Sequence, residues 1–250
     1  RTMQTWQSPP TNTYLANHAV HVWQASLELP DADVAHLSSL LAPDERARAE
    51  RFRFARDKRR YTVGRGVLRQ ILGRYLGVAP QQLAFTYNTH GKPALAELYA
   101  HTGIRFNLSH SGELALYAVS CERDVGVDIE QLRDGIDEIA IAERFFSETE
   151  RAQLQALPPD ERKIAFFRCW TRKEAYIKAH GDGLAMPLDQ FSVPLEHQPS
   201  SKRIVTSDAR ESERWSFVSL DCHPAYAAAV VVEEVIGNLI VGVGYEMMIR

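Results

Sequence analysis

The sequence has few of the features that mark secreted or membrane-spanning proteins. It holds three cysteines, Cys121, Cys169 and Cys222, which are widely spaced and form no Cys-x-x-Cys pair. Neither a disulfide framework nor a zinc site is therefore predicted. No stretch approaches eighteen consecutive apolar residues, and the first thirty residues lack an apolar signal core, so the chain is not expected to span a membrane or to be exported by that route. We expect reduced thiols and a cytoplasmic location.

Several common motifs of enzymes are also missing. The sequence contains no G-x-x-x-x-G-K-[ST], no G-x-G-x-x-G that opens a helix, no G-x-S-x-G and no H-E-x-x-H. The usual signatures of P-loop nucleotide hydrolysis, dinucleotide binding, serine hydrolysis and zinc proteolysis are thus absent.

What remains is the composition of an ordinary globular protein. The chain has 250 residues, of which 45% are hydrophobic and 24% charged. These proportions exclude a disordered or fibrous protein, and the length suits one large domain or two small ones.

Positive charge is concentrated in one segment. The formal net charge is −3, yet residues 46–74 contain eleven basic residues and two acidic ones. A basic region on an otherwise acidic protein should attract a compact polyanion, whereas a long nucleic acid would be repelled by the remainder. The alternative is a solvated arginine-rich face with no ligand.

Local signals predict a mixture of helices and strands. Helices are expected over 44–54 and 58–76, and from Ser147 to about Leu157 through a capping box with Glu150. Pro158–Pro159–Asp160 should end that helix and start another, which runs to about His180 with Gly181 as its C-cap. Short apolar runs predict strands over 83–87, 104–108, 114–120, 125–129, 215–220 and 225–232.

A weak internal echo suggests a duplication. His110 precedes the apolar run 114–119, and His223 precedes the apolar run 225–232. Strands that follow polar turns are common, so this echo alone leaves internal symmetry open.

The segment Val125–Glu130, which has strand periodicity, carries two carboxylates. Asp128 and Glu130 are two residues apart, so both point to one face while Val127 and Ile129 point to the other. Such a pair can bind Mg²⁺, which often takes one or two protein carboxylates. An isolated Asp-x-Glu is more often the solvent face of an edge strand.

A third carboxylate interrupts the apolar stripe of the last predicted helix. Ile164, Phe167, Trp170 and Ile177 lie at helical spacing, and Glu174 falls where an apolar residue is expected. Glu174 either faces a cation or lies on the surface, where Lys178 is its i+4 neighbour. His110, between Ser109 and Ser111, could contact phosphate or could be a hydrogen-bonded turn residue.

Six segments in order resemble the signature of the 4′-phosphopantetheinyl transferases of the Sfp type. They are Asn88–Pro93 (NTHGKP), Phe106–Gly112 (FNLSHSG), Gly126–Glu130 (GVDIE), Arg144–Glu150 (RFFSETE), Trp170–Lys178 (WTRKEAYIK) and Gly181–Leu184 (GDGL). The resemblance covers about residues 40 to 232.

The resemblance implies a fold and an activity. The fold is α+β, a pseudo-dimer of two similar α+β halves with the active site between them, which we assign to residues 1–123 and 124–250. Such enzymes transfer the 4′-phosphopantetheine arm of coenzyme A to a serine of an apo-acyl or peptidyl carrier protein, release adenosine 3′,5′-bisphosphate and require Mg²⁺. The long form implies a monomer, with no nucleic-acid or membrane partner.

The resemblance also assigns roles to residues. It implies that Mg²⁺ is held by Asp128, Glu130 and Glu174, and that catalysis depends on Glu174, Lys178 and His110. Glu174 is the candidate base for the serine proton. The residues implied for coenzyme A are Arg48, Arg60, Lys92, Pro93, Ser109, His110 and Lys178, with Arg51, Arg59 or Arg65 as alternatives for the 3′-phosphate. Tyr61 stands where some relatives have a small hydroxyl residue.

An apolar triad follows the Asp-x-Glu strand. Ile136, Ile139 and Ile141 fall where the family presents apolar surface to the carrier protein, so part of the triad is expected to be exposed as a docking patch. Core packing of the following helix is the alternative.

Two rival functions remain. The first is a coenzyme A-binding module without turnover, and the intact Asp128, Glu130, Glu174 and Lys178 argue against it. The second is a nucleic-acid-binding protein, which the net acidic charge disfavours.

Overall fold

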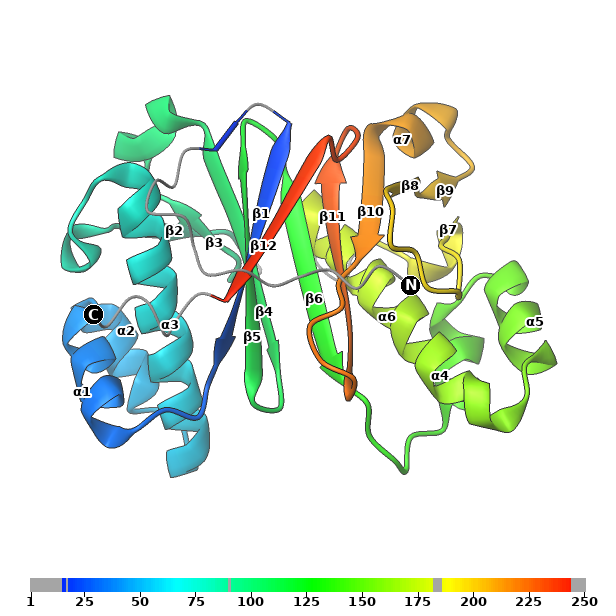
Figure 1. Ribbon diagram of the computed structural model, residues 1–250, viewed down its shortest axis with the longest axis horizontal. Helices are drawn as coiled ribbons and strands as arrows, with labels where there is room; N and C mark the ends of the chain where they lie inside the picture. Colours follow the sequence, from blue (N-terminus) through cyan, green and yellow to red (C-terminus); the bar gives the residue numbers. More distant parts are fainter. Residues whose placement is uncertain (1–14, 17, 90, 182–185, 244–250) are drawn as a thin grey trace.

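Two β-sheets lie face to face at the centre of the computed structural model, with helices on the outer side of each (Figure 1). The structure describes residues 15–16, 18–89, 91–181 and 186–243. This arrangement confirms the α+β class and the two halves predicted from the sequence.

The N-terminal half combines a four-stranded sheet, a small two-stranded sheet and the helices α1 to α3. The four-stranded sheet has the order β12-β1-β5-β4, in which β12 is Asn238–Val243, and the small sheet pairs β2 with β3. The elements of this half are β1 (Ala19–Ser26), α1 (Asp31–Leu40), α2 (Pro43–Ala49), α3 (Ala55–Leu76), η1 (Pro80–Gln82), β2 (Phe85–Tyr87), β3 (Pro93–Leu95), η2 (Glu97–Thr102), β4 (Ile104–Ser111) and β5 (Leu114–Cys121).

The C-terminal half combines the second sheet with α4 to α7. That sheet has the order β6-β11-β10-β8. The elements of this half are β6 (Val125–Gln131), α4 (Glu138–Phe145), α5 (Glu148–Ala156), α6 (Pro159–His180), η4 (Leu188–Gln190), β7 (Phe191–Ser192), β8 (Lys202–Arg203), β9 (Val205–Thr206), α7 (Ala209–Arg214), β10 (Trp215–Ser219) and β11 (Tyr226–Glu233).

Alternation along the strands builds three apolar cores. On β5, Tyr117 and Val119 face α3, whereas Leu116 and Ala118 face the second sheet. Val127 on β6 likewise packs between the two sheets. The two halves are therefore joined by an apolar sheet-to-sheet core, which burial of apolar area stabilises.

The last described strand crosses back to the first half. β12 (Asn238–Val243) pairs in parallel with β1, and Ala19 lies opposite Asn238. The buried Arg123, between β5 and β6, donates hydrogen bonds to the backbone carbonyls of Ala19, Glu233 and Val235. One side chain thus ties both halves to the crossing segment.

Most local predictions are confirmed, with two corrections. The capping box of Ser147 and Glu150 begins α5, and Gly181 ends α6 in the left-handed conformation. The helix predicted over 44–54 stops at Ala49, because Phe52 N bonds back to Ala49 O in a tighter turn before α3. β4 extends to Ser111, so His110 is a strand residue and not part of a turn.

Candidate active site

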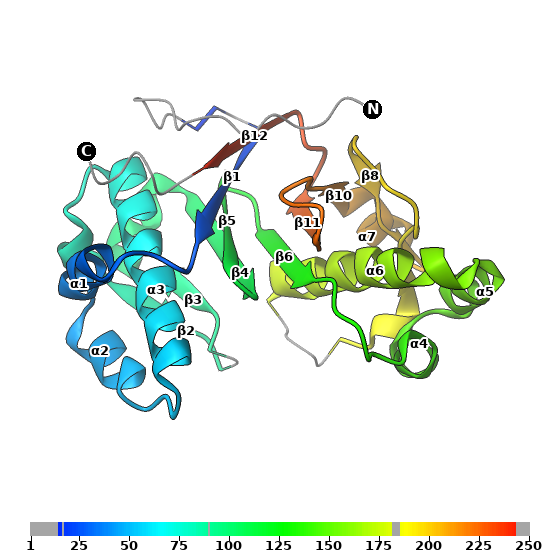
Figure 2. The same cartoon turned by 60° about the horizontal axis from the view of Figure 1, so that its bottom comes forward.

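A cavity of about 520 Å³ lies between the two halves. Figure 2 shows α2, α3 and the β2–β3 hairpin on one side and α6 on the other. The cavity lining includes all seven residues predicted to contact coenzyme A, Arg48, Arg60, Lys92, Pro93, Ser109, His110 and Lys178, together with Glu174. Residues that are far apart in the sequence thus form one site to which both halves contribute.

Gly126 allows helix and strand to meet at this site. A Cβ atom at Gly126 would lie 2.0 Å from Ala175 O and 2.4 Å from Ala179 N, so only glycine lets α6 pack this closely on β6. The close packing places α6, which carries Glu174 and Lys178, directly over the face of β6 that carries Asp128.

Asp128 is the buried centre of the resulting polar cluster. Its Oδ1 accepts a hydrogen bond from Lys178 Nζ at 2.6 Å and another from Ser109 Oγ at 2.8 Å. Lys178 Nζ also lies 2.9 Å from Ser109 Oγ. Asp128 Oδ2 is buried and has no hydrogen-bond partner among the described residues. A carboxylate oxygen in that state has an unused capacity for a cation or a donor.

Two further carboxylates lie in the electrostatic field of Asp128. Burial raises the pKa of Glu174 to about 7, and the negative charges of Asp128 and Glu130 add to this effect. Burial and Asp128 also raise the pKa of Glu130, whose Oε2 accepts a hydrogen bond from Ser111 Oγ at 2.9 Å. Among the described residues, no group of three His, Cys, Asp or Glu side chains is arranged to hold a metal ion by itself.

Lys92 reaches the end of α6 from the other half. Its ammonium donates to the carbonyl oxygen of Lys178 and lies 3.5 Å from that of Ala179. These carbonyls are in the last turn of the helix, where no intrahelical donor remains for them. The side chain of Lys92 therefore lines the cavity, while its ammonium group binds the carbonyl end of α6.

His110 lies on β4 at the edge of the cavity. The surrounding protein desolvates its ring and lowers its pKa, and the positive charges of Lys178 and Arg60 lower the pKa further. A neutral imidazole is thus favoured at neutral pH.

The basic region divides into paired and available cations. Arg65 and Arg69 are buried and bind Glu45. Arg59 pairs with Asp31 and Arg60 with Glu28. The exposed Arg48 lies over the ring of Tyr61, 5.6 Å from its centroid. Of the alternatives for the 3′-phosphate, Arg65 lines the cavity but is committed to Glu45, and Arg59 is not in the lining.

The predicted docking triad is partly buried. Ile136, Ile139 and Ile141 are each half-buried and pack against the apolar core of the C-terminal half. None of them is among the exposed large hydrophobic residues of the described chain. Of the motif GDGL, Asp182, Gly183 and Leu184 lie outside the described residues.

Several residues of the site were not predicted from the sequence. Phe52, Tyr87 and Ile177 contribute apolar and aromatic lining. Asn107 also lines the cavity, and its Oδ1 accepts a hydrogen bond from Val127 N at 2.9 Å, which joins β4 to β6. Asn107 belongs to the motif FNLSHSG, so its position in that motif was the available signal.

Comparisons with known proteins agree with the geometry. A family described as the 4′-phosphopantetheinyl transferase superfamily matches residues 124–231, and one described as 4′-phosphopantetheinyl transferase, N-terminal, matches residues 23–122. The 4′-phosphopantetheinyl transferase HetI of Nostoc sp. is 43% identical over 91% of this chain and 93% of its own length. The 4′-phosphopantetheinyl transferase Sfp of Bacillus subtilis is 33% identical over 77% of this chain and 82% of its own. No helix in the described part of the chain has the length and apolar character needed to cross a membrane.

Proposed function

The chain belongs to the 4′-phosphopantetheinyl transferase superfamily, as an enzyme of the Sfp type, and from this premise we propose how its cavity binds coenzyme A and supports transfer to a carrier protein. Arg48 would hold the 3′-phosphate together with Arg60, whose partly exposed ion pair with Glu28 would have to open. Lys178, His110 and Ser109 would hold the pyrophosphate. Lys92 and Pro93 would border the adenine. All these residues line one cavity, and guanidinium groups are suited to phosphate.

We propose that Asp128 and Glu174 hold the Mg²⁺ ion and that Glu130 reaches it through water, because no group of three such side chains in the described chain is arranged to hold a metal directly. Asp128 Oδ2, which has no hydrogen-bond partner among the described residues, supports this assignment. Burial, together with the negative charge of Asp128, raises the pKa values of Glu174 and Glu130, so a cation among these carboxylates would be favourable. Two carboxylates are the usual protein share of a Mg²⁺ site, with substrate oxygens and water completing it. The bound ion would supply charge neutralisation at the pyrophosphate.

The transfer step requires a base for the serine proton and a cation for the leaving phosphate. The serine Oγ of the carrier attacks the phosphorus of the pantetheine phosphate, an O–P bond forms, and the bond to the departing adenosine 3′,5′-bisphosphate breaks. Glu174, which lines the cavity, would accept the serine proton, directly or through a water. Lys178 stabilises the charge that grows on the leaving phosphate.

One observation supports the proposal most strongly: Lys178, which lines the cavity between the halves, is paired at 2.6 Å with the buried Asp128. One chain supplies both walls of this cavity, which supports a monomer. A boundary of the halves near Asp124 is supported by β5, which belongs to the first sheet, and β6, which belongs to the second. The test is incubation with coenzyme A, Mg²⁺ and a panel of apo-carrier proteins, read by intact mass. We expect phosphopantetheinylated carrier, abolished by a chelator. Unmodified carriers that a known transferase does modify would contradict the proposal.

The role of Glu174 can be separated from that of a simple ligand. Glu174→Gln removes both a ligand charge and the base, so its loss of kcat should persist at saturating Mg²⁺. Turnover against Mg²⁺ concentration measures this. Full rescue by excess Mg²⁺ would show that Glu174 is a ligand and not the base.

We also propose that the exposed parts of Ile136, Ile139 and Ile141 contact the carrier protein. Ile139→Asp should raise the apparent KM for the carrier and leave coenzyme A affinity unchanged. A collapse of the melting temperature would instead assign Ile139 to the core against which it packs.

A further inference from the structure

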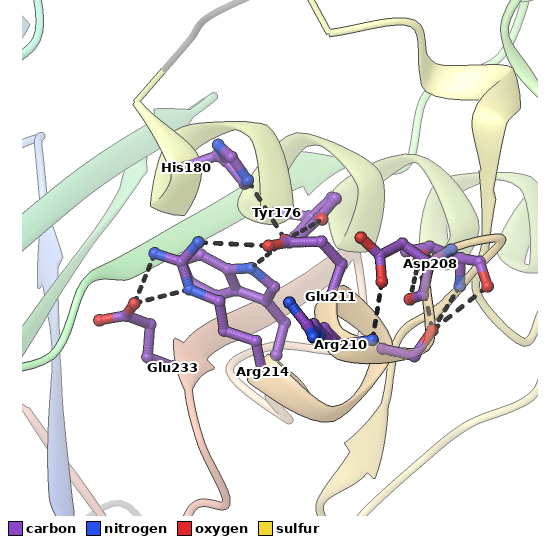
Figure 3. Close-up of polar contacts among 10 residues, drawn as sticks. Tyr176, His180, Asp208, Arg210, Glu211, Arg214 and Glu233 are labelled. Carbon is purple, nitrogen blue, oxygen red and sulfur yellow. Dashed lines mark hydrogen bonds and ion pairs between the residues drawn. The ribbon is translucent and has the colours of Figure 1, made fainter.

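The last turns of α6 are held from the side that faces away from the cavity. Glu211, on α7, accepts hydrogen bonds at its Oε2 from Trp215 Nε1 at 3.0 Å and from Tyr176 Oη at 3.5 Å. The same oxygen lies 3.5 Å from His180 Nε2. Figure 3 shows Tyr176 and His180 of α6 directed toward this carboxylate.

Glu211 is itself fixed by a second ion pair. Arg214 Nη1 lies 3.3 Å from Glu211 Oε1, and Arg214 Nη2 lies 2.7 Å from Glu233 on β11 (Figure 3). The rings of Tyr176 and His180 each pack against Trp215, with centroids 5.7 and 5.5 Å away. The carboxylate is thus part of a connected network that joins α6 to α7 and to the sheet.

The geometry of a helix relates this network to the active site. At 3.6 residues per turn, positions two residues before and after Lys178 lie on the face opposite to it. These positions are Tyr176 and His180, the two α6 residues that Glu211 holds. Lys178 therefore points to Asp128 from one face of the turn, while the other face is anchored to α7.

The anchor matters because this turn is the end of the helix. Lys92 and Asn88 bind backbone carbonyls there from the N-terminal half, Asn88 Nδ2 reaching Gly181 O at 3.2 Å. Glu211 supplies the matching attachment from the C-terminal half. Reacting groups must be held to within about an ångström for efficient transfer.

We propose that Glu211 is a positioning residue for Lys178, acting through Tyr176 and His180. Glu211 does not line the cavity among its described residues, so it acts without touching the substrate. The inference rests on the proposed function, because it assumes that Lys178 stabilises the leaving phosphate.

The test is a double-mutant cycle of Glu211→Ala and Lys178→Ala. Glu211→Ala should lower kcat about tenfold and leave the KM values for coenzyme A and carrier nearly unchanged. In the Lys178→Ala background, the same change should have almost no further effect, because the group that it positions is gone. Glu213→Ala, which removes an exposed carboxylate from the same helix, is the matched control and should leave kcat unchanged.

Each other outcome has a definite meaning. A native kcat in Glu211→Ala, or a loss of equal size in both backgrounds, would overturn the inference. If Glu211→Ala fails to fold, Glu211→Gln replaces it in the cycle. The amide keeps an acceptor for Trp215 but loses the charge that holds His180 and Arg214, so a smaller loss of kcat is expected, and this loss must again vanish in the Lys178→Ala background. Full activity of Lys178→Ala would instead contradict the proposed role of Lys178, which is a separate failure.

Discussion

Glu45 in the N-terminal half and Asp128 at the junction of the halves are both buried carboxylates that bind cations, and they differ in how completely they are satisfied. Glu45 Oε1 accepts from Arg65 and Glu45 Oε2 accepts from Arg69 and from Ala42 N. Asp128 Oδ1 accepts from Lys178, whereas its Oδ2 has no hydrogen-bond partner among the described residues. The difference separates a structural ion cluster from a site prepared for a ligand.

The C-terminal half contains a second satisfied cluster. Glu150 is paired at Oε2 with the fully buried Lys173 at 2.8 Å, and its Oε1 accepts from Val193 N at 2.8 Å. Lys173 also donates to the carbonyls of Leu188 and Phe191. In the described chain, the Glu45 cluster of the N-terminal half and the Glu150 cluster of the C-terminal half thus have both carboxylate oxygens hydrogen-bonded. The Asp128 cluster, which lies between the halves, does not.

Glu45→Gln should give the largest effect on folding. Its amide cannot compensate Arg65 and Arg69, which would remain as buried cations, and the free energy of unfolding should fall by about 3–5 kcal/mol. Denaturant unfolding measures this. A loss below about 1 kcal/mol would contradict the view that Glu45 forms a structural ion cluster.

Asp128→Asn is the matched isosteric change at the incomplete cluster. It should alter the free energy of unfolding by about 1 kcal/mol or less, since Lys178 retains access to water. It should lower kcat/KM at least about 100-fold, because an amide can coordinate Mg²⁺ but cannot neutralise it. Unfolding and turnover measured on one preparation test both expectations. Near-native turnover would contradict the assignment of Asp128.

The same contrast applies to the arginines. Arg48→Ala should weaken binding of coenzyme A about tenfold or more, through the loss of a charge-assisted hydrogen bond of roughly 1.5–3 kcal/mol, and should leave dephospho-coenzyme A almost unaffected. Arg59→Ala, which removes an arginine already paired with Asp31, is the control. Calorimetry with both ligands measures the difference, and equal losses for the two ligands would contradict the 3′-phosphate role.

A smaller effect should come from His21, which is not part of the cavity lining. Its Nδ1 lies 2.6 Å from Tyr75 Oη, its Nε2 is buried with no hydrogen-bond partner among the described residues, and burial lowers the pKa of His21 to about 4. The unfolded chain therefore binds the extra proton at pH values where the folded chain does not. The contribution of neutral His21 to the free energy of unfolding should be present above about pH 6.5, the ordinary pKa of histidine, and should fall by about 1 kcal/mol between pH 6.5 and pH 5.5. His21→Leu should flatten this dependence of the unfolding free energy, and an unchanged slope would contradict the assignment.

Local features were predictable where the signal lies within a few residues. The capping box of Ser147 and Glu150, the end of α6 at Gly181 and the two faces of β6 were all visible in the sequence. The partners of Glu45 were not, because Arg65 and Arg69 reach it only after α2 packs on α3.

The site shows the same limit. The motifs indicated which residues would gather, and the seven residues predicted for coenzyme A and Glu174 line one cavity. Asp128 and Glu130 are not part of its lining, although Asp128 pairs with Lys178, which is. The motifs could not show that the ammonium of Lys92 is used on the carbonyls of α6, or that Lys173, next to Glu174 in sequence, is buried with Glu150. Such contacts depend on tertiary packing and leave no periodic pattern.

The crossing of β12 has a consequence for how the molecule is made. β1 is the first described strand and β12 the last, yet they are neighbours in one sheet, with Val22 opposite Val241. During synthesis, the edge of β1 that pairs with β12 stays unpaired until nearly the whole described chain has left the ribosome. Contacts of such long range slow folding, and open strand edges invite aggregation. The N-terminal half expressed alone is therefore expected to be prone to association, and adding β12 as a separate peptide should suppress it.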